Sequence, residues 1–188
     1  QEIDRNTVKI LTKLWTRPCD WDTFTTAQKA VDRYRKEMDT DYLDIVLIHC
    51  MVYPDWPQRY AKVMEQLSAL KEKGVIGSYG VSCHSVYALQ AAIEHDWTEV
   101  ILARFNNNGT LMDHKPEVIK PMLQQARKKG KGIIGMKVFG GGKTTTEAER
   151  QSSLEYVLNS DAVDAVTLGF GSTAEASDAF ERIRKIGV

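Results

Sequence analysis

The stretch Asp41–Cys50 reads DYLDIVLIHC, and its second part, Asp44–His49, is an almost unbroken apolar run that ends in a histidine. A continuous run of this kind is typical of a β-strand covered on both faces. After an amphipathic stretch comes Leu70–Ser85, LKEKGVIGSYGVSCHS, in which Gly74 is the expected end of a helix. This order of strand, helix and strand predicts a parallel pair of strands joined by a helical crossover.

The same alternation continues outward to both ends of the chain. Strands are expected at Val8–Trp15, Asp44–His49, Ile76–Ser82, Val100–Phe105, Gly132–Val138 and Ala165–Phe170. Helices are expected at Thr25–Met38, from Asp55 to Gly74, at Ser85–Asp96, from Pro116 to Gly130, at Glu147–Leu158 and from Ser172 onward. Six βα units in a row predict an α/β fold with a parallel sheet. A doubly wound open sheet and a (β/α)₈ barrel both fit, because a complete barrel needs eight units and about 250 residues.

The last helix carries two more specific signals. Ser172 and Glu175 have the spacing of a capping box, which would begin the helix. Its apolar residues recur at helical spacing, so we expect the following side chains to face the core: Ala176, Ala179, Phe180, Ile183 and Ile186.

Composition excludes several classes of protein. The chain has 188 residues, 43% hydrophobic and 27% charged, which is ordinary for a single globular domain, here residues 1–188. Its 25 basic residues balance 25 acidic ones, so we expect neither nucleic-acid nor membrane partners. Cys19, Cys50 and Cys83 form no disulfide framework, and no metal-ligand spacing is present. A cytoplasmic location fits this cysteine usage, although an export signal upstream of Gln1 stays open.

Polar residues stand at the carboxyl ends of the expected strands, which is where parallel α/β folds carry their chemistry. Lys13 and His49 lie within apolar runs at two such ends. Taken singly, each is more simply a snorkelling lysine or a hydrogen-bonded core histidine. Together, at equivalent positions, they indicate a catalytic site about as strongly as they indicate structure.

These segments resemble the aldo-keto reductases, from the third to the eighth strand of that family. ILTKLW around Lys13 looks like the strand of the catalytic lysine, and DYLDIVLIHC looks like the strand of the catalytic histidine. GVIGSYGVS looks like the strand that follows. The resemblance therefore implies a (β/α)₈ TIM barrel that is incomplete in this sequence.

The function that the resemblance implies is hydride transfer between NADP or NAD and a small-molecule carbonyl or alcohol. Lys13 and His49 carry over as the catalytic lysine and histidine. The family's general-acid tyrosine and its aspartate partner would precede Gln1. The resemblance also implies these cofactor-binding residues: Ser82, Cys83, Arg104, Met136, Lys137, Phe139, Gly140, Gly141, Gly169 and Ser172. Ser82 would hold the nicotinamide carboxamide, Lys137 and the glycines would wrap the pyrophosphate, and Glu175 would repel a 2′-phosphate.

Two other readings compete with this one. Gly142-Lys143-Thr144 suggests a phosphate-loop NTPase, but the glycine needed five positions earlier is Lys137. A non-catalytic barrel remnant that binds a small molecule or nucleotide is the second alternative. Because a barrel without a quarter of its strands exposes long sheet edges, we expect the isolated 188-residue chain to be unstable or oligomeric.

Overall fold

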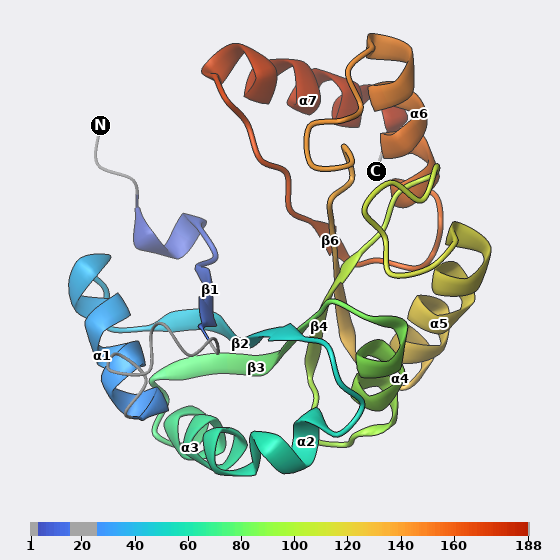
Figure 1. Cartoon of the computed structure of the whole chain (residues 1–188). Coiled ribbons are helices and arrows are strands. Elements are labelled where there is room, and N and C mark those ends of the chain that lie inside the picture. Colours follow the sequence, from blue (N-terminus) through green and yellow to red (C-terminus); the bar gives the residue numbers. More distant parts are fainter. Residues whose placement is uncertain (1–3, 16–25, 188) are drawn as a thin grey trace. The chain divides into compact units, whose positions relative to one another are not determined.

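The computed structural model describes residues 4–15 and 26–187 of the chain. Cys19 and the expected start of the first helix lie outside these residues. The chain divides into two compact units, Gln1–Ile101 and Leu102–Val188. Figure 1 shows the first unit from blue to green and the second from green to red. The expectation of a single domain stays a prediction.

Six strands form the sheet, in the order β1-β2-β3-β4-β5-β6. Their bounds are β1 Leu11–Leu14, β2 Leu43–Met51, β3 Ile76–Cys83, β4 Val100–Arg104, β5 Gly132–Met136 and β6 Ala165–Val166. Strands β1 and β2, β2 and β3, and β5 and β6 pair in parallel. A doubly wound sheet reverses its strand order at a switch point, whereas this order is sequential. The sheet therefore confirms the winding of a partial (β/α)₈ barrel and excludes the doubly wound alternative.

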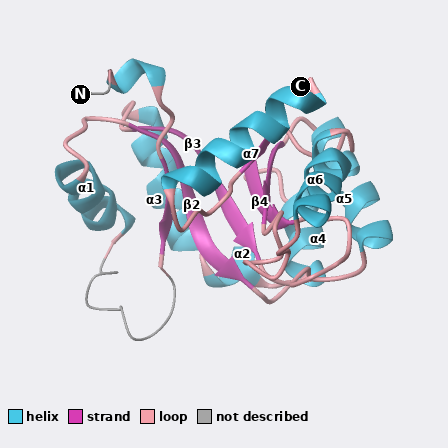
Figure 2. Cartoon of the chain, turned by 90° about the horizontal axis from the view of Figure 1, so that it is seen from above, coloured by secondary structure: helices cyan, strands magenta, loops and turns pink. Residues whose placement is uncertain are grey.

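The first unit covers its strands with helices. Its helices are a 3-10 turn at Arg5–Thr7, α1 Ala27–Glu37, α2 Trp56–Arg59, α3 Ala61–Glu72 and α4 Val86–Glu94. Helices α3 and α4 pack on β3, and α1 packs on α3. Figure 2 shows them in cyan beside the magenta strands. Leu47, Leu67 and Leu89, from β2, α3 and α4, are buried in this core, as the apolar periodicity of these three elements indicates.

One glycine of β3 is required by the packing of the strands. A Cβ added at Gly80 would overlap the carbonyl oxygen of Val100 at the start of β4. Only a residue without a side chain allows this close approach. The close approach of β4 thus explains why Gly80, the later glycine of the GSYGVS stretch, has no side chain.

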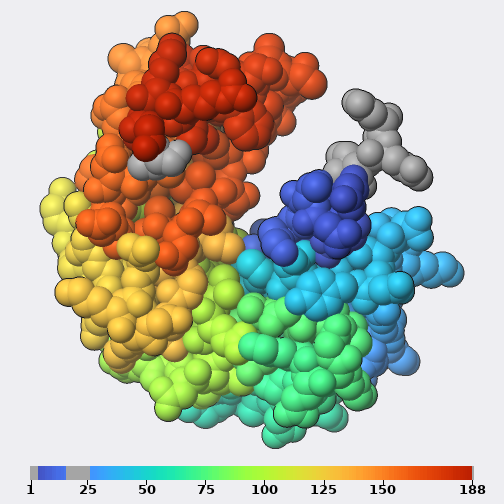
Figure 3. All heavy atoms as spheres, turned by 180° about the vertical axis from the view of Figure 1, so that it is seen from behind, coloured from blue at the N-terminus to red at the C-terminus, as the bar shows by residue number. Residues whose placement is uncertain are grey.

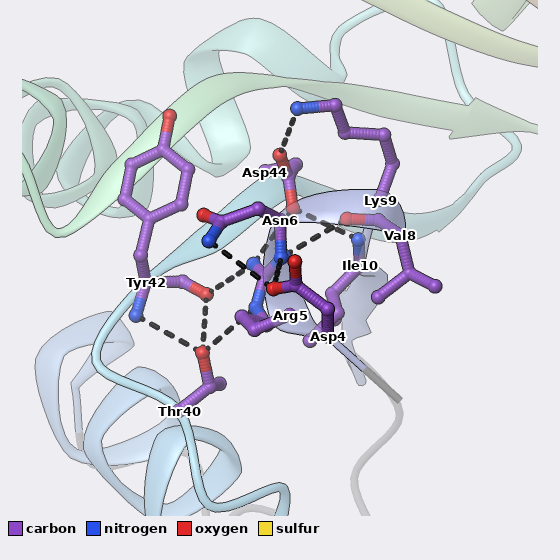
Figure 4. Close-up of polar contacts among 9 residues, drawn as sticks. All are labelled: Asp4, Arg5, Asn6, Val8, Lys9, Ile10, Thr40, Tyr42 and Asp44. Carbon is purple, nitrogen blue, oxygen red and sulfur yellow. Dashed lines mark hydrogen bonds and ion pairs between the residues drawn. The ribbon is translucent and has the colours of Figure 1, made fainter. Parts of the chain in front are cut away.

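Asp44, at the start of β2, anchors the N-terminal segment. Its carboxylate accepts from Arg5 at 2.8 Å and from the Ile10 backbone N–H at 2.9 Å, and it pairs with Lys9 at 3.1 Å. Figure 4 shows these groups converging on Asp44, and Figure 3 shows the dark-blue segment lying against the light-blue one. Burial alone would raise the pKa of Asp44, but these hydrogen bonds and charges lower it to about 2.

The second unit repeats the same construction. Its helices are α5 Pro116–Lys128, α6 Glu147–Leu158 and α7 Thr173–Ile186. Helix α5 packs on β5, and α7 packs on α6. Ile119, Leu123 and Ile133 are buried there. Thr146 begins α6 with a complete capping box to Glu149, which satisfies N–H groups at the helix start.

Several element boundaries differ from those expected. The helix between β2 and β3 breaks at Tyr60 into α2 and α3, and the Asp55 carboxylate pairs with Arg59 at 2.9 Å instead of capping the helix. Strand β5 ends at Met136, and the next residue, Lys137, has a φ of 61°, which lies outside the extended region of a regular strand. Strand β6 keeps two of the six residues expected.

Helix α7 is more exposed than its sequence pattern indicates. Of the five residues expected to face the core, Ala179 is buried, whereas Phe180 is 60% exposed. The reason is that α6 is the main packing partner of α7 within the second unit, and a single neighbouring helix covers only one side of a helix. The expectation that Phe180 faces a core is therefore wrong in this structure.

Candidate active site

His49 and Ser82 meet on one face of the first unit. The register pairs Leu47 with both Lys13 and Gly80, so the residues two positions further along, His49 and Ser82, lie on that same face. The Nδ1 atom of His49 lies 3.0 Å from the hydroxyl oxygen of Ser82. Ser82 is fully buried and His49 is partly buried. The two candidate residues are therefore directly hydrogen-bonded.

Cys50 completes this arrangement through its backbone. The pairing of β2 with β3 is irregular between Ile48 and Met51, and Cys50 within this bulge has a φ of 63°. Its N–H donates to the Ser82 hydroxyl at 2.9 Å. A non-glycine residue in this region stores backbone strain, and such strain is found where the surrounding structure holds it in place.

Two aromatic side chains flank His49. The Trp15 ring centroid lies 4.9 Å from that of His49 in a tilted arrangement. The His84 ring lies 5.6 Å away, edge to face. Both distances fall within the range of favourable aromatic pairs, so the imidazole of His49 is held from two sides as well as through Nδ1.

Lys13 lies on the same face as His49 but is more exposed than its apolar flanks indicate. Its neighbour Leu14 is fully buried, whereas Lys13 itself is exposed. The Tyr34 hydroxyl donates to the Lys13 carbonyl at 3.1 Å, which ties β1 to α1. An exposed lysine fits the snorkelling interpretation, and the catalytic role of Lys13 stays a prediction.

In the second unit, the loop after β5 consists of successive left-handed residues. Lys137 has a φ of 61°, and Gly140, Gly141 and Gly142 have φ values of 55°, 67° and 90°. A Cβ at Gly140 would lie 2.8 Å from Thr110 Cγ2, and one at Gly141 would lie 2.8 Å from Leu111 Cδ1. The loop therefore needs glycine both for its conformation and for its close packing.

Two sets of hydrogen bonds shape this loop. The Lys137 carbonyl accepts from Gly140 N–H at 2.8 Å, and the Phe139 carbonyl accepts from Gly142 N–H at 3.0 Å. The Gly141 and Lys143 N–H groups have no acceptor among the described residues. Two exposed donors beside two lysines can bind an anion.

The buried side chain of Asn106, just after β4, is hydrogen-bonded to the backbone at the start of this loop. Its side-chain amide donates to the carbonyls of Thr110 at 2.8 Å and Lys137 at 3.0 Å. It is 1% exposed, and its Oδ1 atom has no partner among the described residues. No pattern in the sequence indicates that Asn106 supports Lys137.

Arg104 is engaged in an ion pair within its own unit. It donates to the Leu111 carbonyl at 3.1 Å and lies 3.4 Å from the Asp113 carboxylate. Burial raises the pKa of Asp113, and the charge of Arg104 opposes that rise. The contact with cofactor or substrate expected for Arg104 would have to form alongside this pair.

The remaining candidates differ in accessibility. Met136 is 7% exposed, and Gly169 is exposed. Cys83 is fully buried on the strand face opposite to Ser82, because neighbouring strand residues point to opposite faces. Its contact with the cofactor stays a prediction.

Ser172 begins α7 as expected, with a modified capping pattern. Its hydroxyl accepts from Glu175 N–H at 3.2 Å. The Glu175 carboxylate accepts from Gly171 N–H at 2.7 Å, not from the Ser172 N–H of a full capping box. The helix start already carries a negative charge, which opposes a second anion there.

Within the described ranges, no group of His, Cys, Asp or Glu residues is placed to hold a metal ion. Across the same part of the chain, no helix is long and apolar enough to cross a membrane.

Comparison with known proteins gives a consistent result. The model of the aldo/keto reductase family matches residues 1–187. A methylglyoxal reductase of Yersinia pestis is 33% identical over 93 residues, which cover 49% of this chain and 31% of that protein. The chain thus matches about a third of the length of this curated relative.

Solved structures agree on the fold. A Pseudomonas aeruginosa protein assigned to the aldo-keto reductases superposes with a TM-score of 0.75 at 22% identity, over 97% of this chain and 68% of that one. A Klebsiella pneumoniae aldo/keto reductase, solved with NADP and acetate, gives 0.71 at 16% identity, over 95% and 65%. At these identities the likeness is one of fold.

Proposed function

The chain belongs to the aldo/keto reductase family, and on that premise we propose that it interconverts a carbonyl compound and an alcohol by hydride transfer with a nicotinamide cofactor. The observation that carries the proposal is the imidazole of His49. It is held at the carboxyl end of β2 by Ser82 and by two flanking rings. Such a preorganised donor can stabilise the charge that develops on a carbonyl oxygen.

The roles of the polar residues follow from this reaction. His49 binds the carbonyl oxygen through its second ring nitrogen and orients the substrate. Lys13, on the same face of the first unit, supplies positive charge beside the proton donor, since an ammonium favours the deprotonated form of a neighbouring acid. No residue of 1–188 is assigned as that proton donor.

The loop after β5 fits a nucleotide diphosphate. Exposed N–H groups at Gly141 and Lys143, with the Lys137 side chain within 3.7 Å of where a Gly141 Cβ would stand, offer donors and charge to phosphate oxygens. When bound, the nicotinamide supplies or accepts the hydride. Residues of this loop hold the phosphates, and Met136 and Phe139 add apolar surface next to them.

The cofactor of the proposal is NADP or NAD. The Klebsiella pneumoniae relative was solved with NADP, which supports a nicotinamide nucleotide. In this chain, Glu175 places a carboxylate at the start of α7, which would repel a 2′-phosphate. We therefore expect NADH to be accepted at least as well as NADPH.

The test is a steady-state assay of the full-length protein. Oxidation of NADPH and NADH is followed by absorbance with a panel of small aldehydes, ketones and 2-oxoaldehydes. Turnover that requires both the reduced nucleotide and a carbonyl supports the proposal, and no turnover with any carbonyl in the panel contradicts it.

A matched pair of lysine variants sharpens the assay. Lys13→Met removes the charge on the His49 face and should lower kcat by about 100-fold or more, the scale of a lost acid–base partner. Lys9→Met removes an 80% exposed lysine that pairs with Asp44 and should leave kcat within about 2-fold, since exposed pairs contribute little. Equal losses in both would contradict the role given to Lys13.

A further inference from the structure

Two successive carbonyl groups at the start of the loop after β5 accept hydrogen bonds from buried side chains. The Lys137 carbonyl accepts from the Asn106 amide at 3.0 Å. The Val138 carbonyl accepts from the Ser153 hydroxyl at 2.6 Å. Asn106 follows β4 and Ser153 lies in α6, so two elements that are far apart in the sequence fix adjacent peptide groups of the loop.

The amide of Asn106 uses both of its protons. Its Nδ2 atom donates to the Thr110 carbonyl at 2.8 Å as well as to Lys137, whereas its Oδ1 atom has no partner among the described residues. A buried polar atom without a partner is unfavourable, so the two donors are what this side chain supplies. A carboxylate, a hydroxyl or an aliphatic group cannot provide two N–H donors from one position.

Ser153 occupies a packed position of α6. It has no exposed surface, and its neighbour Leu154 is also fully buried. A serine inside a helix often bonds back to a carbonyl of its own helix. The Ser153 hydroxyl instead donates to Val138, outside the helix. A polar side chain at this buried position is therefore explained by its bond to the loop.

The direction of the two carbonyls matters for an anion. A carbonyl oxygen carries the negative end of a peptide dipole and repels a phosphate, whereas an N–H group attracts it. The carbonyls of Lys137 and Val138 are drawn to buried donors. The N–H groups of Gly141 and Lys143, by contrast, have no acceptor among the described residues. Donors that are already held in place bind an anion without the cost of ordering the loop.

We propose that Asn106 and Ser153 form a two-point clamp that holds residues 137–143 in their anion-binding conformation before a nucleotide binds. Both side chains are at most 1% exposed, so they are positioning residues that act through the loop. The effect of the clamp on nucleotide affinity rests on the proposed function, whereas the conformation of the loop is a property of the protein alone.

The first test is amide hydrogen exchange at Gly140 in the full-length protein without nucleotide, because the Gly140 N–H donates to the clamped Lys137 carbonyl at 2.8 Å. Asn106→Leu keeps a side chain of similar size and removes both donors. We expect exchange at Gly140 to become roughly tenfold faster, the scale of one lost hydrogen bond. An unchanged rate would overturn the proposal.

The neighbouring asparagine provides a matched control. The Asn107 amide donates to the Ser152 hydroxyl at 3.0 Å and not to the loop, so Asn107→Leu should leave Gly140 exchange within about 2-fold of wild type. An equal acceleration in both variants would overturn the assignment to Asn106.

Wild-type protein alone gives a test that needs no variant to fold. The Gly140 amide of the nucleotide-free protein should exchange at least about tenfold more slowly than in an unstructured peptide. Exchange at the unstructured rate would overturn the proposal, because the loop would then not be held before binding.

Nucleotide titration and kinetics test the effect on binding. Asn106→Leu and Ser153→Ala should each weaken the Kd of NADPH or NADH about 3- to 10-fold, and the loss should appear in Kd instead of in kcat at saturating nucleotide. Ser153→Thr keeps the hydroxyl and should restore the Kd. A loss confined to kcat would overturn the proposal.

The double variant tests whether the two side chains act together. Once one point of the clamp is lost, the second holds less, so the double variant should lose less affinity than the product of the two single losses. A loss equal to that product would overturn the clamp. If wild type binds neither nucleotide but Gly140 exchange depends on Asn106, the proposed function fails and the clamp on the loop stands.

Discussion

Cys50 in the first unit and Lys137 in the second have the same left-handed backbone conformation, but they belong to different kinds of site. Cys50 lies in the bulge near the end of β2, and Lys137 directly follows β5. Their φ values are 63° and 61°. The Cys50 N–H is fixed by a buried serine of the next strand. Lys137 is exposed, and its carbonyl is held by Asn106 and Gly140.

The difference shows how one strained conformation serves two kinds of site. At Cys50 the left-handed residue lies in a bulge, and its N–H donates to the Ser82 hydroxyl that is also hydrogen-bonded to His49. At Lys137 it opens a loop whose next left-handed residues are glycines, which leaves backbone N–H groups exposed. The first arrangement suits orientation of a reacting group, and the second suits binding of an anion.

The largest expected effect separates the two sites. His49→Gln should lower kcat by about 100-fold or more with a nearly unchanged nucleotide Kd, because it removes a donor to the developing charge. Lys137→Ala should weaken the Kd with little change in kcat, because it removes a charge from the phosphate loop. Steady-state kinetics and nucleotide titration of both variants check this, and exchanged effects would break the comparison.

A pair of glycine variants tests the loop next. Gly140→Ala adds both a left-handed alanine and a Cβ at 2.8 Å from Thr110 Cγ2, so we expect nucleotide affinity to fall about tenfold or more. Gly142→Ala has a φ of 90° but meets no atom within 4 Å, so its loss should be several-fold smaller. Fluorescence titration measures both, and equal losses would show that crowding against Thr110 is irrelevant.

Acid titration tests the contacts of Asp44, which anchor the N-terminal segment of the first unit. The pKa of Asp44 falls from an ordinary 3.8 to about 2 in the fold, so its contribution is complete above pH 4 and is lost as pH falls from 3.8 through 2. We expect about 1–2 kcal/mol, reduced by solvent screening at the surface.

Denaturant unfolding of wild type and Asp44→Asn between pH 2 and 6 measures that contribution. The two proteins should differ most near pH 6 and converge toward pH 2. A stability difference that is constant over this range would contradict the pairing of Asp44 with Arg5 and Lys9 shown in Figure 4.

The preference between NADPH and NADH should change by a smaller factor than the effects above. Glu175→Gln removes the carboxylate at the start of α7, so NADPH should bind about 3- to 10-fold more tightly, while the Kd of NADH stays within about 2-fold. Calorimetric titration with both nucleotides checks this. Equal tightening of both would show that Glu175 does not face the 2′-phosphate.

The smallest expected effect concerns Lys137 itself. At a φ of 61°, Lys137→Gly should be more stable than Lys137→Ala by about 1 kcal/mol, because glycine avoids the left-handed penalty of a Cβ. Thermal unfolding compares the two variants. If alanine is as stable as glycine, the strain at Lys137 is not real.

The sequence was sufficient for the alternation of strands and helices, because each element carries its own apolar period. Helix Glu147–Leu158 begins and ends where its pattern indicated. The break at Tyr60 and the early end of β5 were missed, since both depend on backbone angles that side-chain pattern does not reveal.

The site was predictable in part. Lys13, His49 and Ser82 came from position at strand ends and from family resemblance, and the structure places them on one face of the first unit. The bond of Ser82 to His49 was missed because it depends on the register between β2 and β3, which the pattern of side chains does not give.

The central claim, that this family member uses a nicotinamide cofactor, is tested most directly by titrating the full-length protein with NADPH and NADH while following tryptophan fluorescence. We predict saturable binding of at least one nucleotide, weakened by Lys137→Ala. Absence of saturable binding for both nucleotides would contradict the account and remove the catalytic roles given to Lys13 and His49.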